Sequence, residues 1–177
     1  MKIAIFGGTG DLGRGLAICF AAAGHEIIVG SRSQERADQA AEGLREALRD
    51  ERRAQAFYRA VMARHGAVRP FVNIVEAEAR HEDAVASLMR RRGVADTGGD
   101  LGALPEVPGT LAACCALAAS LERENIAMYD RLLPRVSDAE VQRLFGGLRD
   151  ASKNNHLPAF ERWSTRAGAG RGGPARS

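Results

Sequence analysis

The sequence has few cysteines, no long apolar run and no leader-like start, and each absence excludes a class of protein. Its three cysteines, Cys19, Cys114 and Cys115, are too few for a disulfide framework. We expect the adjacent pair to be buried as small apolar side chains. No apolar run reaches the roughly 20 residues that a membrane-spanning helix needs. The N-terminus does not read as a signal peptide, so we expect a cytoplasmic, soluble protein.

Aromatic residues make up only 5% of the 177 residues, whereas apolar residues make up 45%. A chain of this length can bury a sizeable core. Few aromatics beside many alanines and arginines suit a mainly α protein better than a β-sandwich. The net charge of +3 is small, and arginines in residues 164–177 account for it. The charge therefore does not predict a nucleic-acid partner, and residues 164–177 are expected to form a disordered basic tail.

At the N-terminus, two short apolar runs enclose a glycine-rich turn and a helical stretch. The turn, GGTGDLGRG, spaces its glycines as GxGxxG. Between a strand and a helix, this spacing lets the backbone approach a pyrophosphate at the helix N-terminus. An NAD site would place an acid after the second run, but Arg32 stands there, and arginine suits the 2′-phosphate of NADP. The candidate NADP-binding residues are Gly8, Thr9, Gly10, Gly13, Ser31 and Arg32.

The segment MKIAIFGGTGDLGRGLAICFAAAGHEIIVGSRS is similar to the N-terminus of the deazaflavin-dependent NADP reductases. The similarity covers only about residues 1–40. A Rossmann domain needs several more strands and roughly 100 further residues. We therefore expect residues 1–43 to form a truncated dinucleotide-binding βαβ unit. The resemblance implies NADP as a cofactor, but we do not expect the hydride-transfer activity of that family.

From Ser33 onward, helical periodicity replaces the strand pattern. We expect helices over about residues 33–65, 70–93, 110–133 and 137–163. A break near Gly43 would separate the βαβ unit from the helices, and Pro70 suits the start of the second helix. Residues 93–109 are rich in glycine and proline, so they predict a long loop. Such a crossover would make the second and third helices run in the same direction.

Acids and histidines occupy positions that otherwise carry apolar side chains. Glu78 and His81 are three residues apart in a stripe whose other members are Phe71, Ile74, Val85 and Leu88. Burying them is costly unless a cation neutralises them. Glu51 and Tyr58 are seven residues apart and so share one helix face. The same spacing recurs at Glu122 and Tyr129, and His156 follows in the last helix.

Four segments resemble the ferritin-like superfamily, close to rubrerythrin relatives and a ferritin-like family of unassigned function: DERRAQAFYRAV, RPFVNIVEAEARHEDAVASL, ASLERENIAMYDRLL and ASKNNHLPAFERW. The resemblance implies a ferritin-like four-helix bundle over residues 44–163 that holds iron or manganese. The implied metal ligands are Glu51, Glu78, His81, Glu122 and His156. Lys153 stands where a full two-metal site would have Glu, so we expect one well-held metal, or a loosely held second one, rather than a symmetric pair.

Three functions remain open at this stage. The chain could be a redox-active metal-binding bundle, a dinucleotide-binding oxidoreductase-like protein, or a metal-free structural or interaction module. Glu51 and Glu122 could be exposed acids beside arginines, and His156 could be a core histidine. Both tyrosines could be core aromatics whose hydroxyls bond nearby acids. The expected partners are metal ions and NADP, without nucleic acid or membrane, and a homodimer is one possible assembly. The sequence does not decide whether the protein is an enzyme.

Overall fold

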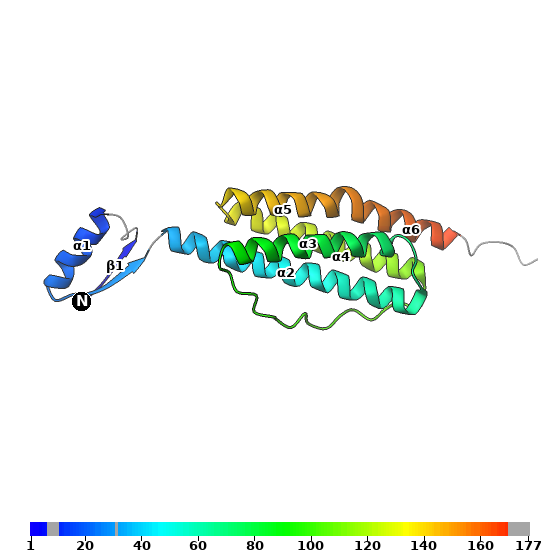
Figure 1. Ribbon diagram of the computed structural model, residues 1–177, viewed down its shortest axis with the longest axis horizontal. Coiled ribbons are helices and arrows are strands. Elements are labelled where there is room, and N and C mark those ends of the chain that lie inside the picture. Colours follow the sequence, from blue (N-terminus) through cyan, green and yellow to red (C-terminus); the bar gives the residue numbers. More distant parts are fainter. Residues whose placement is uncertain (7–10, 31, 170–177) are drawn as a thin grey trace, which may run out of the picture.

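The computed structural model describes residues 1–6, 11–30 and 32–169, and the chain is mainly helical within these ranges (Figure 1). Strands β1 (Lys2–Phe6) and β2 (Glu26–Gly30) are parallel and flank helix α1 (Asp11–Ala22). The predicted βαβ order is therefore confirmed. Within the described ranges, the sheet has no further strand.

The βαβ unit leaves large apolar side chains open to solvent. Leu12, Ile18 and Ile28 are 80%, 70% and 56% exposed. Two strands and one helix cannot cover both faces of a sheet, so the exposure follows from the size of the unit. The unit projects from one end of the helical body and joins it through the start of the next helix (Figure 1).

Long helical segments lie side by side to form the helical body (Figure 1). They are α2 (Arg32–His65), α3 (Phe71–Arg91), α4 (Leu111–Leu132), α5 (Ala139–Ala151) and α6 (Leu157–Ala169). A 3-10 turn, η1 (Leu133–Arg135), follows α4, and a π-helical turn, η2 (Ser152–His156), joins α5 to α6. Residues 94–109 run back along the body, so α3 and α4 point in the same direction (Figure 1). The predicted long crossover is therefore present.

Two apolar clusters fill the helical body. One contains Leu48, Leu88, Tyr129 and Phe145, and the other contains Phe57, Phe71, Cys115 and Phe160. Each long helix contributes one stripe of apolar residues, as expected for amphipathic helices that pack together. Among the described residues, neither cluster includes a member of the βαβ unit. The stability of the body therefore comes from α2 onward.

The structure can be compared with the predictions for the cysteines, the C-terminal tail and membrane crossing. Cys114 and Cys115 are buried as predicted, whereas Cys19 is exposed. Residues 164–169 are helical in α6, so the disordered tail was predicted to begin too early, and residues 170–177 lie outside the described ranges. None of the helices in the described ranges combines the length and the apolarity that a membrane crossing requires.

The predicted break at Gly43 is wrong, because α2 passes through this residue without interruption. A Cβ atom added to Gly43 would lie 3.3 Å from the ring of Phe145 and 3.6 Å from Leu132. The glycine therefore allows α5 to pack closely against α2. This close packing offsets the low helix propensity of glycine.

Candidate metal centre

All five predicted ligands meet between the two apolar clusters of the helical body. Glu51, Glu78 and Glu122 come from α2, α3 and α4 and are 2%, 3% and 2% exposed. The possible ligand atoms of Glu51, Glu78 and His81 lie within 4.8 Å of one another. The same is true of Glu78, Glu122 and His156. The helical body thus contains two overlapping groups of candidate ligands that share Glu78.

Glu78 connects the two histidines. Its Oε2 lies 2.9 Å from His81 Nδ1, and its Oε1 lies 3.0 Å from His156 Nδ1. On one side, Glu51 Oε2 is 3.4 Å from His81 Nδ1, and on the other, Glu122 Oε1 is 3.5 Å from His156 Nδ1. The two imidazole rings stack with their centroids 5.5 Å apart. The arrangement is therefore nearly symmetric about Glu78.

The two buried tyrosines hold the outer carboxylates. Tyr129 donates a hydrogen bond of 2.7 Å to Glu51, and Tyr58 donates one of 2.6 Å to Glu122. Burial, together with the nearby carboxylates, raises the pKa of both phenols well above the usual value, so both remain proton donors. The expectation that their hydroxyls bond nearby acids is confirmed. The alternative that Glu51 and Glu122 are exposed acids is wrong.

The charges of the cluster balance one another without a metal. Burial raises the pKa of Glu51. Burial also disfavours the ionised form of Glu78. The interactions with His156 and His81 together have the larger effect, so the pKa of Glu78 is lowered. Burial opposes protonation of the histidines, yet the neighbouring carboxylates raise the pKa of His81 to about 9 and that of His156 to about 10. At neutral pH the imidazoles are therefore protonated, and a metal would have to displace these protons.

One ring nitrogen of the cluster has no hydrogen-bond partner among the described groups. His156 Nδ1 is buried and unsatisfied, although it lies 3.0 Å from Glu78 Oε1. This N···O distance fits an ion pair, but the angle at the nitrogen does not fit a hydrogen bond. Buried polar atoms without a partner are uncommon and call for an explanation. A nitrogen that faces two carboxylates without a hydrogen bond suits a metal ligand.

Lys153 does not occupy the place of a fourth acid, and the expectation that it lies near the metal is wrong. Lys153 is exposed because the segment from Ser152 to His156 is a π-helical turn. A π-turn holds more residues than an α-turn, so the residue that faces inward lies four positions before His156 instead of three. That residue is Ser152, which is buried and donates a hydrogen bond of 2.8 Å to Asn125 Oδ1.

A buried polar chain beside the cluster was not predicted. Ser152 bonds Asn125, and Asn125 Nδ2 donates a hydrogen bond of 2.6 Å to Asp50 Oδ2. Burial raises the pKa of Asp50 to about 6. The sequence did carry a signal, because Asp50 directly precedes Glu51 and Asn125 follows Glu122 by three residues on one helix face. The sequence does not predict that Ser152 faces inward, because this orientation depends on the π-turn.

The candidate dinucleotide residues lie around the βαβ unit. Gly13 belongs to α1, and Arg32 is the first residue of α2, two positions after β2 ends. The other four candidates, Gly8, Thr9, Gly10 and Ser31, lie outside the described residues. The strand–helix–strand order that the glycine motif requires is present.

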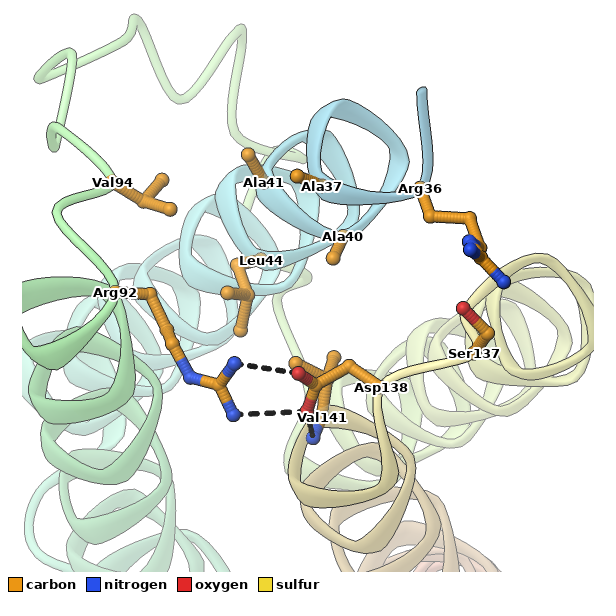
Figure 2. A pocket seen from close by; sticks show the side chains of 10 residues that line it. All are labelled: Arg36, Ala37, Ala40, Ala41, Leu44, Arg92, Val94, Ser137, Asp138 and Val141. Atoms are coloured by element: carbon orange, nitrogen blue, oxygen red, sulfur yellow. Dashed lines mark hydrogen bonds and ion pairs between the residues drawn. The ribbon is translucent and has the colours of Figure 1, made fainter. Parts of the chain in front are cut away.

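A separate cavity of about 330 Å³ lies where α2 begins (Figure 2). Ala37, Ala40 and Ala41 line it along α2, and Figure 2 shows Arg92 reaching across to Asp138, with which it forms an ion pair. None of the five predicted metal ligands lines this cavity. It is therefore distinct from the metal centre.

Comparison with known proteins relates the N-terminal segment to one family. Residues 2–68 match the family model described as NADP oxidoreductase coenzyme F420-dependent. The F420-dependent NADP reductase of Methanothermobacter thermautotrophicus is 63% identical over 41 residues, which cover 23% of this chain and 18% of that protein. The reductase of Methanocaldococcus jannaschii is 53% identical over 49 residues, covering 28% and 22%. The chain thus spans about a fifth of the length of the curated relatives it matches.

A solved structure resembles a larger part of the chain. A hypothetical protein from Methanococcus jannaschii DSM 2661 matches with a TM-score of 0.64 and 22% identity. The match covers 72% of this chain and 81% of that one. The βαβ unit ends at Gly30 and is too short to account for such coverage, so most of the similarity lies in the helical body. The comparisons therefore show that the start of the chain is similar in sequence to NADP reductases and that the body is similar to a known structure in fold alone.

Proposed function

We propose that the helical body is a ferritin-like four-helix bundle that binds iron or manganese between Glu51, Glu78, His81, Glu122 and His156. The observation that carries the proposal is the pair of overlapping ligand groups that share Glu78 inside an apolar body. Carboxylate and imidazole ligands from facing helices are how bundle proteins hold such metals. A bound cation would replace the imidazolium protons that balance these carboxylates in the metal-free protein.

The near-symmetry of the cluster favours two ions, and Glu78 would be available to both. Glu51 and His81 would hold one ion, and Glu122 and His156 would hold the other. The expectation of a single well-held metal depended on Lys153, which is exposed. When bound, iron or manganese would supply redox chemistry. Tyr129 and Tyr58 would keep Glu51 and Glu122 in place through their hydrogen bonds.

Elemental analysis after anaerobic loading with Fe(II) or Mn(II) tests this function. The wild-type protein should retain up to about two ions per chain after removal of free metal. Glu78→Gln keeps the shape of the side chain but removes the shared charge, so it should lose most of the metal while the helical circular dichroism remains. Glu76→Gln is the matched control, because Glu76 is exposed on the same helix. Absence of metal from the wild type would leave the body as a structural or interaction module.

A second candidate function is NADP binding by the βαβ unit, and the sequence match of residues 2–68 favours it. Proteins named F420-dependent NADP reductases share this segment, but the chain covers about a fifth of their length. We therefore propose binding of NADP without the reaction of those enzymes. Arg32 would contact the 2′-phosphate, which NAD lacks.

Titration calorimetry with NADP and NAD tests this second function. Arg32→Ala should weaken NADP binding more than NAD binding, because only NADP offers a phosphate for a charge-assisted hydrogen bond. Arg36→Ala, one helical turn further along α2, is the matched control. An equal loss of both nucleotides would show that Arg32 does not distinguish them.

A further inference from the structure

Two cavities adjoin one another between α2 and α4, one nearer the surface and one at the ligand cluster. The outer one has a volume of about 370 Å³, and residues of the crossover, including Asp100 and Leu101, form part of its wall. The inner one has a volume of about 20 Å³ and reaches Tyr58, Glu78 and Glu122. The residues that line both cavities are Asp50, Arg53 and Glu124.

The inner cavity is large enough for a small ion and too small for an organic substrate. A single water molecule needs about 10–15 Å³ of such space, and the inner cavity offers about 20 Å³. The outer cavity would hold a hydrated ion with many water molecules. An ion moving inward would therefore lose most of its water between the two cavities.

The charge of the inner cavity favours a cation. The carboxylates of Asp50, Glu78, Glu122 and Glu124 line it, whereas Arg53 supplies the one guanidinium in its wall. Acidic walls in a medium of low dielectric constant concentrate cations and repel anions. Asp50 and Glu124 stand further out than Glu78 and Glu122, because they also line the outer cavity. The wall of the outer cavity carries the carboxylates of Glu46, Asp50, Asp100 and Glu124 beside Arg49, Arg53 and Arg131, so carboxylates are available in both cavities.

Arg53 lines both cavities. Its Nε is buried without a hydrogen-bond partner among the described residues, and its positive charge partly offsets the rise in the pKa of Asp50. Asp50, by contrast, is held by a hydrogen bond of 2.6 Å from Asn125. Movement of the Arg53 side chain would break no hydrogen bond at Nε, and its positive charge opposes the passage of a cation.

We propose that these adjoining cavities are the passage by which a divalent metal ion reaches Glu78 and Glu122, with Asp50 and Glu124 as transient ligands and Arg53 as the gate. The proposal rests on the metal-binding function proposed above. The five proposed ligands set the affinity for the ion, whereas the passage residues set the rate at which the ion reaches them. A steric change in the passage should therefore alter the rates of binding and release by the same factor and leave the dissociation constant unchanged. A change of charge should also alter the affinity, because the charge of Asp50 is coupled to those of Glu78 and Glu122.

Rapid mixing of the metal-free protein with Co(II) and a fluorescent indicator of free Co(II) measures uptake, and a chelator chase measures release. Asp50→Asn and Glu124→Gln should slow uptake, on the order of tenfold. Arg53→Gln should accelerate uptake, because it removes the opposing charge. Asp83→Asn and Arg80→Gln are matched controls, since both residues are exposed on α3 and line neither cavity.

A steric variant tests the same passage without a change of charge. Ala54 lines the inner cavity, so Ala54→Leu should slow uptake and release together while the amount of bound Co(II) at equilibrium stays the same. Unchanged rates in all four passage variants, with full metal binding, would overturn the passage alone. A changed dissociation constant in Ala54→Leu, without a matching change in both rates, would overturn it too, because Ala54 would then affect the bound ion and not its passage. Absence of Co(II) binding by the wild type would overturn the passage together with the proposed metal function.

Discussion

At the scale of single residues, helical periodicity explains why the burial of the candidate ligands could be predicted. Glu78 and His81 interrupt an apolar stripe, so burial of the stripe also buries them. The partner of each tyrosine could not be predicted, because Tyr58 bonds Glu122 and Tyr129 bonds Glu51 across the body. Spacing along one helix shows which residues share a face, whereas these bonds depend on how the helices pack.

The raised histidine pKa values predict how the stability of the metal-free protein depends on pH. The pKa values of His81 and His156 rise from 6.5 to about 9 and about 10 on folding. Their contribution to stability is complete below pH 6.5 and is lost as the pH rises through the folded values. The free energy of unfolding, measured by urea denaturation, should therefore fall between pH 6.5 and about 10. Metal affinity should rise over the same range, since the metal displaces these protons.

The double variant His81→Gln with His156→Gln provides the control for this dependence. It removes both imidazoles, so its unfolding free energy should vary much less between pH 6.5 and about 10 than that of the wild type. A wild-type stability that stays constant or rises over this range would show that the carboxylates do not retain the imidazolium protons in the folded state.

At the scale of elements, the helix ends were predictable because they depend on local chemistry. Gly66 and Gly93 follow α2 and α3 with φ angles of +85° and +64°, a conformation that favours glycine. The helix break predicted at Gly43 is wrong. Glycine commonly weakens a helix, but here its lack of a side chain leaves room for the Phe145 ring. The π-turn before His156 was also missed, since its extra residue follows from packing and leaves no periodic pattern.

The contact between α2 and α5 at Gly43 leads to a stability prediction. Gly43→Val would place two methyl groups against the ring of Phe145, so it should lower the free energy of unfolding by about 1–3 kcal/mol. Gly146→Ala is the matched control, because a Cβ there meets nothing within 4 Å. Alanine has a higher helix propensity than glycine, so Gly146→Ala should raise the free energy of unfolding by about 0.5–1 kcal/mol. If denaturation curves showed both variants to be stabilised, the proposed role of Gly43 in packing would be wrong.

At the scale of the whole molecule, the sequence divides at its change of periodicity, but the helix continues across the division. Strand patterns and glycine spacing identified the βαβ unit, and the apolar stripes identified the body. The predicted boundary near Gly43 fell inside α2, which begins at Arg32. The change of periodicity reflects which residues are buried, whereas a helix ends only where its backbone hydrogen bonds end.

Removal of residues 1–31 tests whether the two parts work separately. Both apolar clusters lie within the helical body, so the remaining chain should keep its helical circular dichroism, its cooperative melting and its metal content. It should also lose any binding of NADP. A loss of cooperative melting would show that the βαβ unit stabilises the body, and the proposed division of functions would then fail.

The central claim is that a metal lies between the two ligand groups that share Glu78, and anomalous diffraction tests it most directly. Crystals of the full chain soaked with Mn(II) should show anomalous density within about 2.0–2.6 Å of the Glu78 carboxylate. The same density should lie beside the imidazole of His81 or His156. Crystals of the Glu78→Gln variant should lack it. Anomalous density found only at surface carboxylates, or none in the wild type, would contradict the account.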